Sequence, residues 1–474
     1  MEEIYSFFRQ HPLPYKYITF PYIDDPPTGR HPYHAFLVNK VIAELTARYF
    51  NKSGFPHVED FNKKWNVSWG QQFDPPEYQR CLPWQKINHF AGAFLIGKKG
   101  ELHKRMCSLK QRVPNIDFYP ESYLSSDTTT LQQNWKNHKH WILKPIASSR
   151  GEGITIVDSS QSISIQPGYI VQEYIERPLL ICNSQKFDIR LYVLVTSIYP
   201  LRIYLHDFGL ARLATHKYGG ELTDVCSHLT NVSLNRHDSS FNSAQQKLSL
   251  DEMFTIISKH GISREEIQRQ FNEISAIAII SASTQILEYH QKYIKSRQTS
   301  FELFGIDILI DENRKCHLIE VNVSPSMSGK DSQLDYYQKS EIIAEMMNIG
   351  RVIDCDPKLN DPCPGISLYD DEYHKAIEQK VNPTDWMNPS FADIVNIRDF
   401  VEEKLTLKRF KRIFPKRKNL NNLLKCFERI NKNDLAFVEW IKMSNEERKD
   451  AFVRGEKIYV ETLDMIYKKL ENMK

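Results

Sequence analysis

The sequence predicts an α+β protein with a helical, basic C-terminal extension. Short alternating apolar runs, typical of strands, occur over residues 141–205 and again over 301–323. A helical pattern separates them between residues 250 and 290, and helical spacing returns from about residue 386. The 474 residues, 41% of them hydrophobic, allow two or three domains, and a net charge of +3 excludes a general polycation.

The elements follow in order along the chain. Residues 35–49 have the spacing of a first helix, and a loop rich in Trp and Pro follows over 65–84. Gly261 ends a helix predicted over 250–260, and Ser263 with Glu266 predicts a capping box for the next helix. The predicted early strands are 141–143, 154–157, 169–171, 189–195 and 201–205.

Cysteine usage and the N-terminus indicate the compartment. Eight cysteines are scattered without CxxC pairs or zinc-type spacing, which favours reduced thiols in a cytosolic protein. The first residues lack the long apolar stretch of a signal peptide. The longest apolar-rich run, near 274–280, is too short to span a bilayer. We therefore expect a soluble, intracellular protein that does not enter membranes.

The most informative stretch, residues 301–326, predicts a metal-binding hairpin. Its two strand-like runs flank a turn near Asn313, so Asp307 lies opposite Glu320. Asn322, two residues after Glu320, shares its face. These three oxygen ligands suit Mg²⁺, which usually shares its shell with substrate phosphates. The alternative is a solvated sheet face whose charges pair with nearby lysine or arginine, and the whole constellation favours the metal.

A small-residue loop follows the strand that ends in Lys144. The loop contains Arg150, Gly151 and Gly153, and a second strand begins at Ile154. Backbone N–H groups of such a loop can cover phosphates, while the lysine neutralises their charge. The chain has no Walker motif, and a short RGxG is weak alone because ordinary hairpins also use glycine.

Two further strand segments bear polar groups. Residues 172–175 end a strand, and their backbone and side chains can form the wall of an adenine pocket. Lys186, Asp188 and Arg190 then alternate with apolar Phe187 and Ile189. A plain amphipathic edge strand explains that alternation equally well.

Taken together, these motifs resemble the tubulin tyrosine ligase-like family, whose fold is ATP-grasp. The resemblance covers about residues 88–351, with a weaker match around 410–427. The motifs are WILKPIASSRGEGI, VQEYIERPLLI, KFDIRLYVLVTS, PLRIYLHDFGLAR, HLTNVSLN and FELFGIDILID…LIEVNVSPS. The resemblance implies an N-terminal subdomain (1–90), a central subdomain (91–175) and a C-terminal subdomain with the metal site (176–351). Beyond them, Pro357, Pro362 and Pro364 indicate a linker (352–385), and the pattern that follows predicts a helical basic tail (386–474).

The resemblance also implies roles for individual residues. Lys144, Arg150 and Arg190 are the expected catalytic groups, and Asp307, Glu320 and Asn322 the expected Mg²⁺ ligands. Gly100 stands after Lys99 where an acidic residue is usual, which weakens the assignment of Lys99. The residues expected to bind ATP are Lys99, Lys144, Arg150, Gly151, Gln172, Glu173, Tyr174, Ile175, Lys186, Phe187, Asp188, Thr230 and Asn231.

The expected amino-acid donor is free glutamate. Arg212 resembles the arginine that holds the donor carboxylate, and Ser233 and Lys247 complete that pocket. Lys247 is less securely aligned because the preceding loop varies. Two cations suit a dicarboxylic amino acid, so the pattern resembles the glutamate-adding branch, and Arg150 resembles members that start branches. The resemblance implies an acyl phosphate on an acceptor γ-carboxylate, which glutamate attacks to form an isopeptide bond.

The basic tail suggests how an acidic acceptor is met. Eight lysines and arginines lie within residues 404–418, with no acid among them. A solvated helix end is the ordinary explanation of such a run. With an acidic tubulin tail as substrate, we favour an electrostatic docking surface over a nucleic-acid site. The expected partners are tubulin or microtubules, and we expect a monomer located in the cytoplasm and cytoskeleton, including cilium or basal body.

Three alternatives stay open. The chain could be an ATP-grasp ligase acting on a small carboxylate, although the HLTN and GLAR motifs disfavour this. It could be a glycine-adding relative, which a donor comparison would distinguish. It could be an inactive microtubule-binding module, but the lysine, arginine and metal-ligand positions of such a module would be degraded, and here they are intact.

Overall fold

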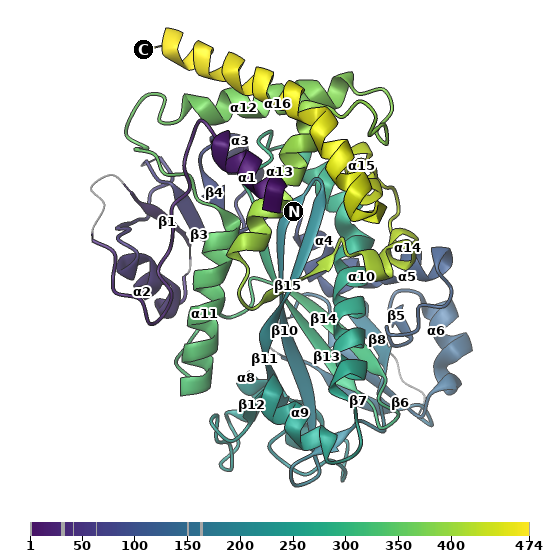
Figure 1. The fold of residues 1–474 in the computed structure, drawn as a ribbon. Coiled ribbons are helices and arrows are strands. Elements are labelled where there is room, and N and C mark those ends of the chain that lie inside the picture. The colour runs from purple at the N-terminus through teal and green to yellow at the C-terminus, as the bar shows by residue number, and fades with distance from the viewer. Residues whose placement is uncertain are drawn as a thin grey trace.

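The computed structural model describes residues 2–29, 34–40, 42–62, 64–148, 151–161 and 165–473. It confirms the α+β class, with three sheets and a set of C-terminal helices (Figure 1). The chain begins and ends on the same side of the molecule, where helix α1 (Glu2–Gln10) contacts α13 (Phe391–Thr406) and α16 (Asn445–Asn472) lies across the top of the view (Figure 1).

The N-terminal sheet is parallel and has the order β2-β1-β3-β4. The prediction of one helix over 35–49 is wrong, because residues 36–39 form strand β1 and the helix begins only at Glu44. Phe36 and Leu37 are buried and pair with β3, so sheet packing overrides local helical spacing. The elements are β1 (Phe36–Asn39), α2 (Glu44–Lys52), β2 (His57–Val58), β3 (Val67–Gly70), α3 (Pro75–Gln79) and β4 (Lys86–Ile87).

A second, four-stranded sheet has the order β5-β8-β6-β7 and is antiparallel throughout. Its small core contains Trp141, Leu143 and Val171. Two helices, α4 (Phe94–Gly97) and α5 (Lys99–Arg112), precede it. Its elements are β5 (Ser122–Leu124), α6 (Thr128–Asn134), a 3-10 turn (Trp135–Asn137), β6 (His140–Pro145), β7 (Thr155–Asp158) and β8 (Tyr169–Glu173).

The main sheet has seven strands, in the order β12-β11-β10-β13-β14, with β15 added on β11 and β9 on β10. Long strands β10 and β11 form its centre, and helix α10 packs on it (Figure 1). Its strands are β9 (Leu180–Ile181), β10 (Gln185–Ile198), β11 (Leu201–Leu213), β12 (Lys247–Ser249), β13 (Glu302–Ile310), β14 (Cys316–Val323) and β15 (Phe410–Phe414). The associated helices are α7 (Val225–His228), α8 (Val232–Asn235), α9 (Leu250–Ser258), α10 (Arg264–Gln291) and α11 (Gln333–Gly350).

The C-terminal region is part of the main core. The predicted linker, residues 352–385, contains helix α12 (Pro364–Gln379), and Pro364 occupies the first helical turn, where proline is favoured. The basic run expected to be helical contains strand β15, which pairs with β11. The remaining elements are a 3-10 turn (Arg417–Asn419), α14 (Leu420–Leu424) and α15 (Lys432–Lys442).

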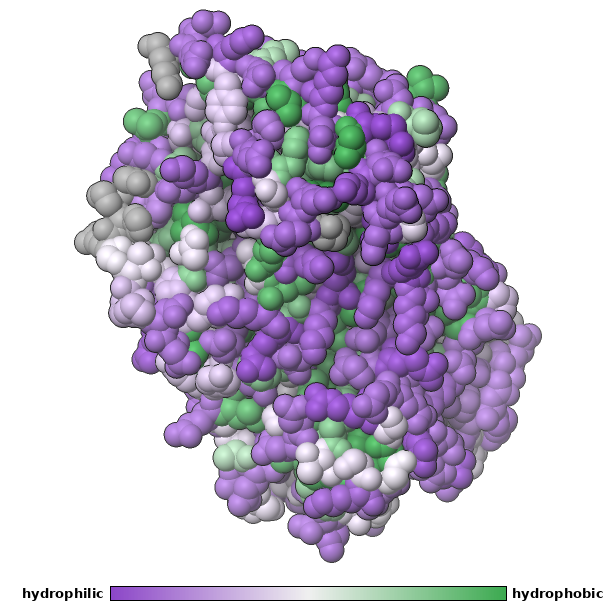
Figure 2. Space-filling view, in the orientation of Figure 1, coloured by the Kyte–Doolittle hydropathy of each residue, from purple (hydrophilic) through white to green (hydrophobic). Residues whose placement is uncertain are grey.

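The cysteines, the helices and one face of the surface bear on the expectations from the sequence. Among the described residues, the eight cysteines form no disulfide. No helix in the described part of the chain has both the length and the apolar character needed to cross a membrane. Hydrophilic residues cover most of the face in Figure 2, and hydrophobic ones lie there in small groups.

Candidate active site

Two buried lysines lie close together at the meeting of the small sheet and the main sheet. Lys144, near the end of β6, donates from Nζ to Gln172 Oε1 at 2.6 Å. Lys186, at the start of β10, lies 4.4 Å from the centre of the Tyr174 ring and donates to its hydroxyl at 3.2 Å. Burial lowers the pKa of Lys144 to about 8, and burial together with Lys144 lowers the pKa of Lys186 to about 7. An anion placed beside them would favour the charged forms of both lysines.

Strand pairing determines where the predicted metal ligands lie. Strand β13 runs between β10 and β14, with Asp307 opposite Arg190 on one side and Glu320 on the other. The Asp307–Glu320 pairing predicted from the sequence is therefore confirmed. A register shift between Asp307 and Ile308 accompanies that pairing. Asn322, on β14, donates from Nδ2 to Glu320 Oε1 at 2.9 Å, so the three predicted ligands converge.

The charges of this cluster are unequal. Burial raises the pKa of Glu320, and the carboxylate of Asp307 adds to that rise. Burial opposes ionisation of Asp307 too, but Arg190 and Arg212 hold its pKa well below the usual range. Arg190 donates to both oxygens of Asp307, at 2.5 and 3.0 Å. The carboxylates of Asp307 and Glu320 thus face each other, and a cation bound between them would relieve their repulsion.

The donor set fits magnesium better than a metal held by protein alone. Within the described ranges, no group of three or more His, Cys, Asp or Glu side chains is placed to hold a metal ion. Asp307 and Glu320 with the Asn322 amide provide two carboxylates and one neutral oxygen. Mg²⁺ is typically bound through one or two carboxylates and completes its shell with water and phosphate oxygens. The residues present therefore fit a nucleotide-bound magnesium.

The predicted donor pocket lies on the same face of the sheet. Arg212 on β11 donates to both oxygens of Asp188, at 2.7 and 2.5 Å, and to Asp307 Oδ2 at 2.9 Å. Lys247 on β12 is the cross-strand partner of Arg212. The ammonium of Lys247 is held by Asp331 and Asp335. Arg212 thus links the metal cluster to a second cation one strand away.

The phosphate-covering loop approaches the HLTN segment. Gly151 has a φ of +86°, and a side chain there would lie 2.6 Å from Leu234 and 3.0 Å from Asn231. Glycine is therefore required by both conformation and space. Asn231 is the N-cap of α8, which also contains Ser233, and the preceding Thr230 is buried. Lys99 donates to the backbone oxygen of Ser148 at 2.7 Å, so it reaches the same loop.

Comparison with known proteins shows which family the chain is related to. Residues 77–359, more than half of the chain, match the tubulin-tyrosine ligase family. The chain belongs to this family. This match confirms the family resemblance seen in the sequence. All of the predicted site residues lie within the matched range.

Several relatives are glutamate-adding enzymes by name. Tubulin monoglutamylase TTLL4 of Mus musculus is 33% identical over 327 residues, which are 66% of this chain and 27% of the relative. Tubulin polyglutamylase ttll-4 of Caenorhabditis elegans is 35% identical over 294 residues, 60% of this chain and 49% of the relative. Tubulin polyglutamylase TTLL5 of Mus musculus is 29% identical over 390 residues, 79% and 29% respectively. The chain thus spans no more than about half the length of these curated relatives.

The remaining predicted residues of this family member differ in what their side chains can contact. Phe187 is buried in the main hydrophobic core, so only its backbone is available to a nucleotide. Glu173 accepts the backbone N–H of Glu121 at 3.2 Å and pairs with His138, on the small sheet. Ile175 directly follows Tyr174, whose hydroxyl meets Lys186. Arg150 lies outside the described residues.

Sequence reasoning missed three residues of this site. Gly305 on β13 would place a side chain 3.1 Å from Arg190 Cδ, so glycine there leaves room for that arginine. A glycine inside a strand signals such a close approach. Asp331 and Asp335 surround Lys247. A signal for Asp335 was present, because Ser332 and Asp335 have the spacing of a helix N-cap.

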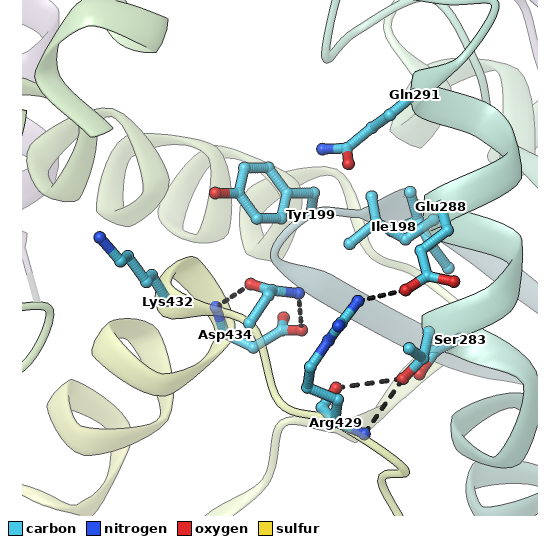
Figure 3. Close-up of a pocket in the computed structure, with 11 residues that line it drawn as sticks. Ile198, Tyr199, Ser283, Glu288, Gln291, Arg429, Lys432 and Asp434 are labelled. Carbon is cyan, nitrogen blue, oxygen red and sulfur yellow. Dashed lines mark hydrogen bonds and ion pairs between the residues drawn. The ribbon is translucent and has the colours of Figure 1, made fainter. Parts of the chain in front are cut away.

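A separate cavity of about 240 Å³ lies away from this site (Figure 3). The turn between β10 and β11, helix α10 and the loop before α15 form its walls. Arg429 reaches across it to Glu288 on α10 (Figure 3). Asp434, which also lines it, accepts the backbone N–H of Leu201 at 2.6 Å. None of the predicted site residues lines it.

Proposed function

We propose that this chain uses ATP and magnesium to join the amine of free glutamate to the γ-carboxylate of a glutamate in an acidic tubulin tail. The observation that carries the proposal is the row of charges on strands β12, β11, β10, β13 and β14, which unites a metal cluster with two donor-binding cations. The names of the relatives support glutamate as the donor and tubulin as the acceptor.

In this proposal, the small sheet and the main sheet hold ATP between them, as in an ATP-grasp ligase. Lys144 and Lys186 neutralise the phosphates, assisted by Lys99 and the loop with Arg150 and Gly151. Gln172, Glu173, Tyr174 and Ile175 form the adenine wall, with further contacts from Phe187, Asp188, Thr230 and Asn231. Magnesium held by Asp307, Glu320 and Asn322 supplies charge neutralisation at the transferring phosphoryl group.

The reaction has two steps. The acceptor γ-carboxylate attacks the terminal phosphorus of ATP, giving an acyl phosphate and ADP. The glutamate amine then attacks the acyl carbon, inorganic phosphate leaves, and the nitrogen loses a proton as the isopeptide bond forms. Arg190 stabilises negative charge on the transferring group and the tetrahedral centre, because its guanidinium lies beside the metal cluster. Arg212 and Lys247, with Ser233, hold the donor carboxylates.

The acceptor and the cellular setting follow from the same proposal. The cations of residues 404–418 provide an electrostatic surface for an acidic tail. Arg412 is partly buried and stacks on the Phe400 ring, and Arg409 and Lys411 both pair with Asp207. We place the enzyme in the cytoplasm on the cytoskeleton, with cilium or basal body as specific sites, and we expect a monomer.

Incubation of the chain with tubulin, ATP and magnesium tests this function. We expect labelled glutamate to be incorporated in preference to glycine or tyrosine, with mass spectrometry locating it on tail γ-carboxylates. Preferred glycine incorporation would contradict the assignment of Arg212 and Lys247. Chain length in the same spectra would separate initiation from elongation.

Glu320→Gln tests the metal cluster. We expect a loss of about 100-fold or more in turnover with saturating ATP and magnesium, the scale of removing one preorganised charge. Glu312→Gln is the matched control, because Glu312 lies in the turn of the same hairpin and is exposed. Parent-like turnover of Glu320→Gln would show that the metal assignment is wrong.

A further inference from the structure

Two carboxylates of unequal freedom hold the ammonium of Lys247. Asp335 Oδ2 lies 2.5 Å from Lys247 Nζ, and Asp331 Oδ2 lies 2.9 Å from the same atom. The side chains of Lys247 and Asp335 are 4% and 0% exposed, whereas that of Asp331 is 40% exposed. One partner of the lysine is therefore sealed in the protein, and the other is in contact with solvent.

Asp335 is a fixed partner. Its second oxygen lies 2.5 Å from Lys339 Nζ, so one buried carboxylate serves two ammonium groups. Its backbone N–H donates to Ser332 Oγ at 3.0 Å and thereby caps helix α11. Burial opposes ionisation of Asp335, but Lys339 and Lys247 hold its pKa below the usual range. Removing this carboxylate would leave two buried cations facing each other, which is costly.

Asp331 has the opposite character. Its backbone is fixed, because its carbonyl oxygen accepts a hydrogen bond from Ser243 Oγ at 2.8 Å and Ser332 begins the cap of α11. Its carboxylate is exposed although Lys247 is buried, so water screens its side of the pair, and an ion pair that is screened by solvent contributes less to stability. A rotation of this side chain alone would release Lys247 without moving the loop, and water would solvate the freed carboxylate.

We propose that Asp331 is a built-in competitor of the donor amino acid, because its carboxylate occupies on Lys247 the place that the second carboxylate of the donor takes. The inference rests on the proposed function, in which Arg212 and Lys247 bind a dicarboxylic donor. Asp335 is the permanent counter-ion that keeps Lys247 in position. The second carboxylate of the donor replaces the Asp331 carboxylate on Lys247. The lysine therefore always has two carboxylates beside it, one of them from Asp335. A donor without one leaves Asp331 in place.

Asp331→Asn measures the competition directly. We expect the dissociation constant for glutamate, measured by calorimetry on the full chain loaded with a non-hydrolysable ATP analogue, to fall about two- to fivefold, the range of an exposed ion pair. The affinity for the ATP analogue should not change. Asp464→Asn is the matched control, an exposed aspartate on α16 far along the chain from the site, and it should bind glutamate like the parent.

A double-mutant cycle with Lys247→Met separates competition from a general loss of negative charge. If Asp331 acts on Lys247, Asp331→Asn has no effect on glutamate affinity when Lys247 is already methionine. A gain of equal size in both backgrounds would overturn the inference, and so would unchanged affinity of Asp331→Asn in a parent chain that binds glutamate. A parent chain that binds no glutamate would instead refute the proposed function itself.

Discussion

Lys144 and Lys186 are buried cations whose charge depends on what lies beside them. In the chain without nucleotide, their pKa values fall to about 8 and about 7, Lys144 through burial and Lys186 through burial and the repulsion of Lys144. A triphosphate placed against them favours the charged form and raises both values. If ATP binds at these residues, as proposed, its binding is linked to proton uptake.

At pH 8, we expect ATP binding to take up close to one proton at Lys186. The group is mostly neutral before binding, since its pKa of about 7 lies below this pH, and is charged afterwards. Calorimetry in buffers of different ionisation enthalpy measures the uptake. Lys186→Met should remove most of it, and Lys217→Met, at a nearby exposed lysine, should not. Equal uptake by parent and Lys186→Met would show that Lys186 does not meet the phosphates.

At the residue scale, the site contacts that could be predicted from the sequence are those between residues close together in the chain. Glu320 and Asn322 share a face because they are two apart, and Asp307 faces Glu320 because one turn joins their strands. The partners of Lys247 were out of reach. Asp335 is 88 residues away and meets Lys247 only because α11 packs beside β12. No local pattern encodes such a contact.

Among the elements, strand β15 depends on one buried carboxylate. Glu345, on α11, accepts the backbone N–H groups of Lys408 at 2.6 Å, Arg409 at 2.9 Å and Phe410 at 3.0 Å. These are the residues that lead into β15, which continues the main sheet beyond β11. Although burial opposes ionisation, the His206 side chain, 3.5 Å away, and the backbone N–H groups of Lys408 and Phe410 lower the pKa of Glu345.

Glu345→Ala should lower the free energy of unfolding by about 2–4 kcal/mol, because three backbone N–H groups, of which that of Phe410 is buried, lose a charged acceptor. Urea unfolding followed by circular dichroism measures the change, and Gln333→Ala, at an exposed position of α11, is the control. Since the folded-state pKa is lowered, the parent loses this advantage as pH falls below the unfolded-state value of about 4.3. A difference that does not shrink as the pH falls below that value would contradict the role of the carboxylate charge.

Element type was predicted where pattern and packing agree. The N-cap of α10 at Ser263 is confirmed, since its side chain accepts the Glu266 N–H. Strand β15 was not predicted, because the lysine and arginine in FKRIF interrupt the alternating apolar pattern of the buried positions Phe410 and Ile413. Its partner β11 lies about 200 residues earlier, so pairing rather than local propensity makes it a strand.

For the whole molecule, the C-terminal region completes the core although the family match ends at residue 359. Asp399, on α13, is buried and pairs with Arg351 at 3.0 Å and also with Arg297. Arg202, on β11, lies 3.8 Å from the same carboxylate. Three buried guanidinium groups from the matched range therefore depend on a carboxylate beyond it.

A chain ending at residue 359 should not fold into a soluble monomer. It would expose apolar core residues that α12, α13, α15 and α16 cover, and it would leave the three arginines without Asp399. Soluble yield and size-exclusion chromatography measure the outcome. A chain ending after residue 468, which loses only the last turn of α16, is the control. A monodisperse product from the shorter chain would show that the matched range is an independent unit.

The row of charges across the main sheet has a consequence for how activity is acquired. The charged groups of this row are spread over five strands, and strand pairing aligns them. A slip of one residue between β10 and β13 would turn Asp307 to the opposite face and present Ile306 or Ile308 in its place. Such a product would lack the proposed metal ligand and would be catalytically silent. Specific activity therefore measures the fraction of molecules in which these strands have the native register. It can differ between preparations whose secondary structure is the same by circular dichroism.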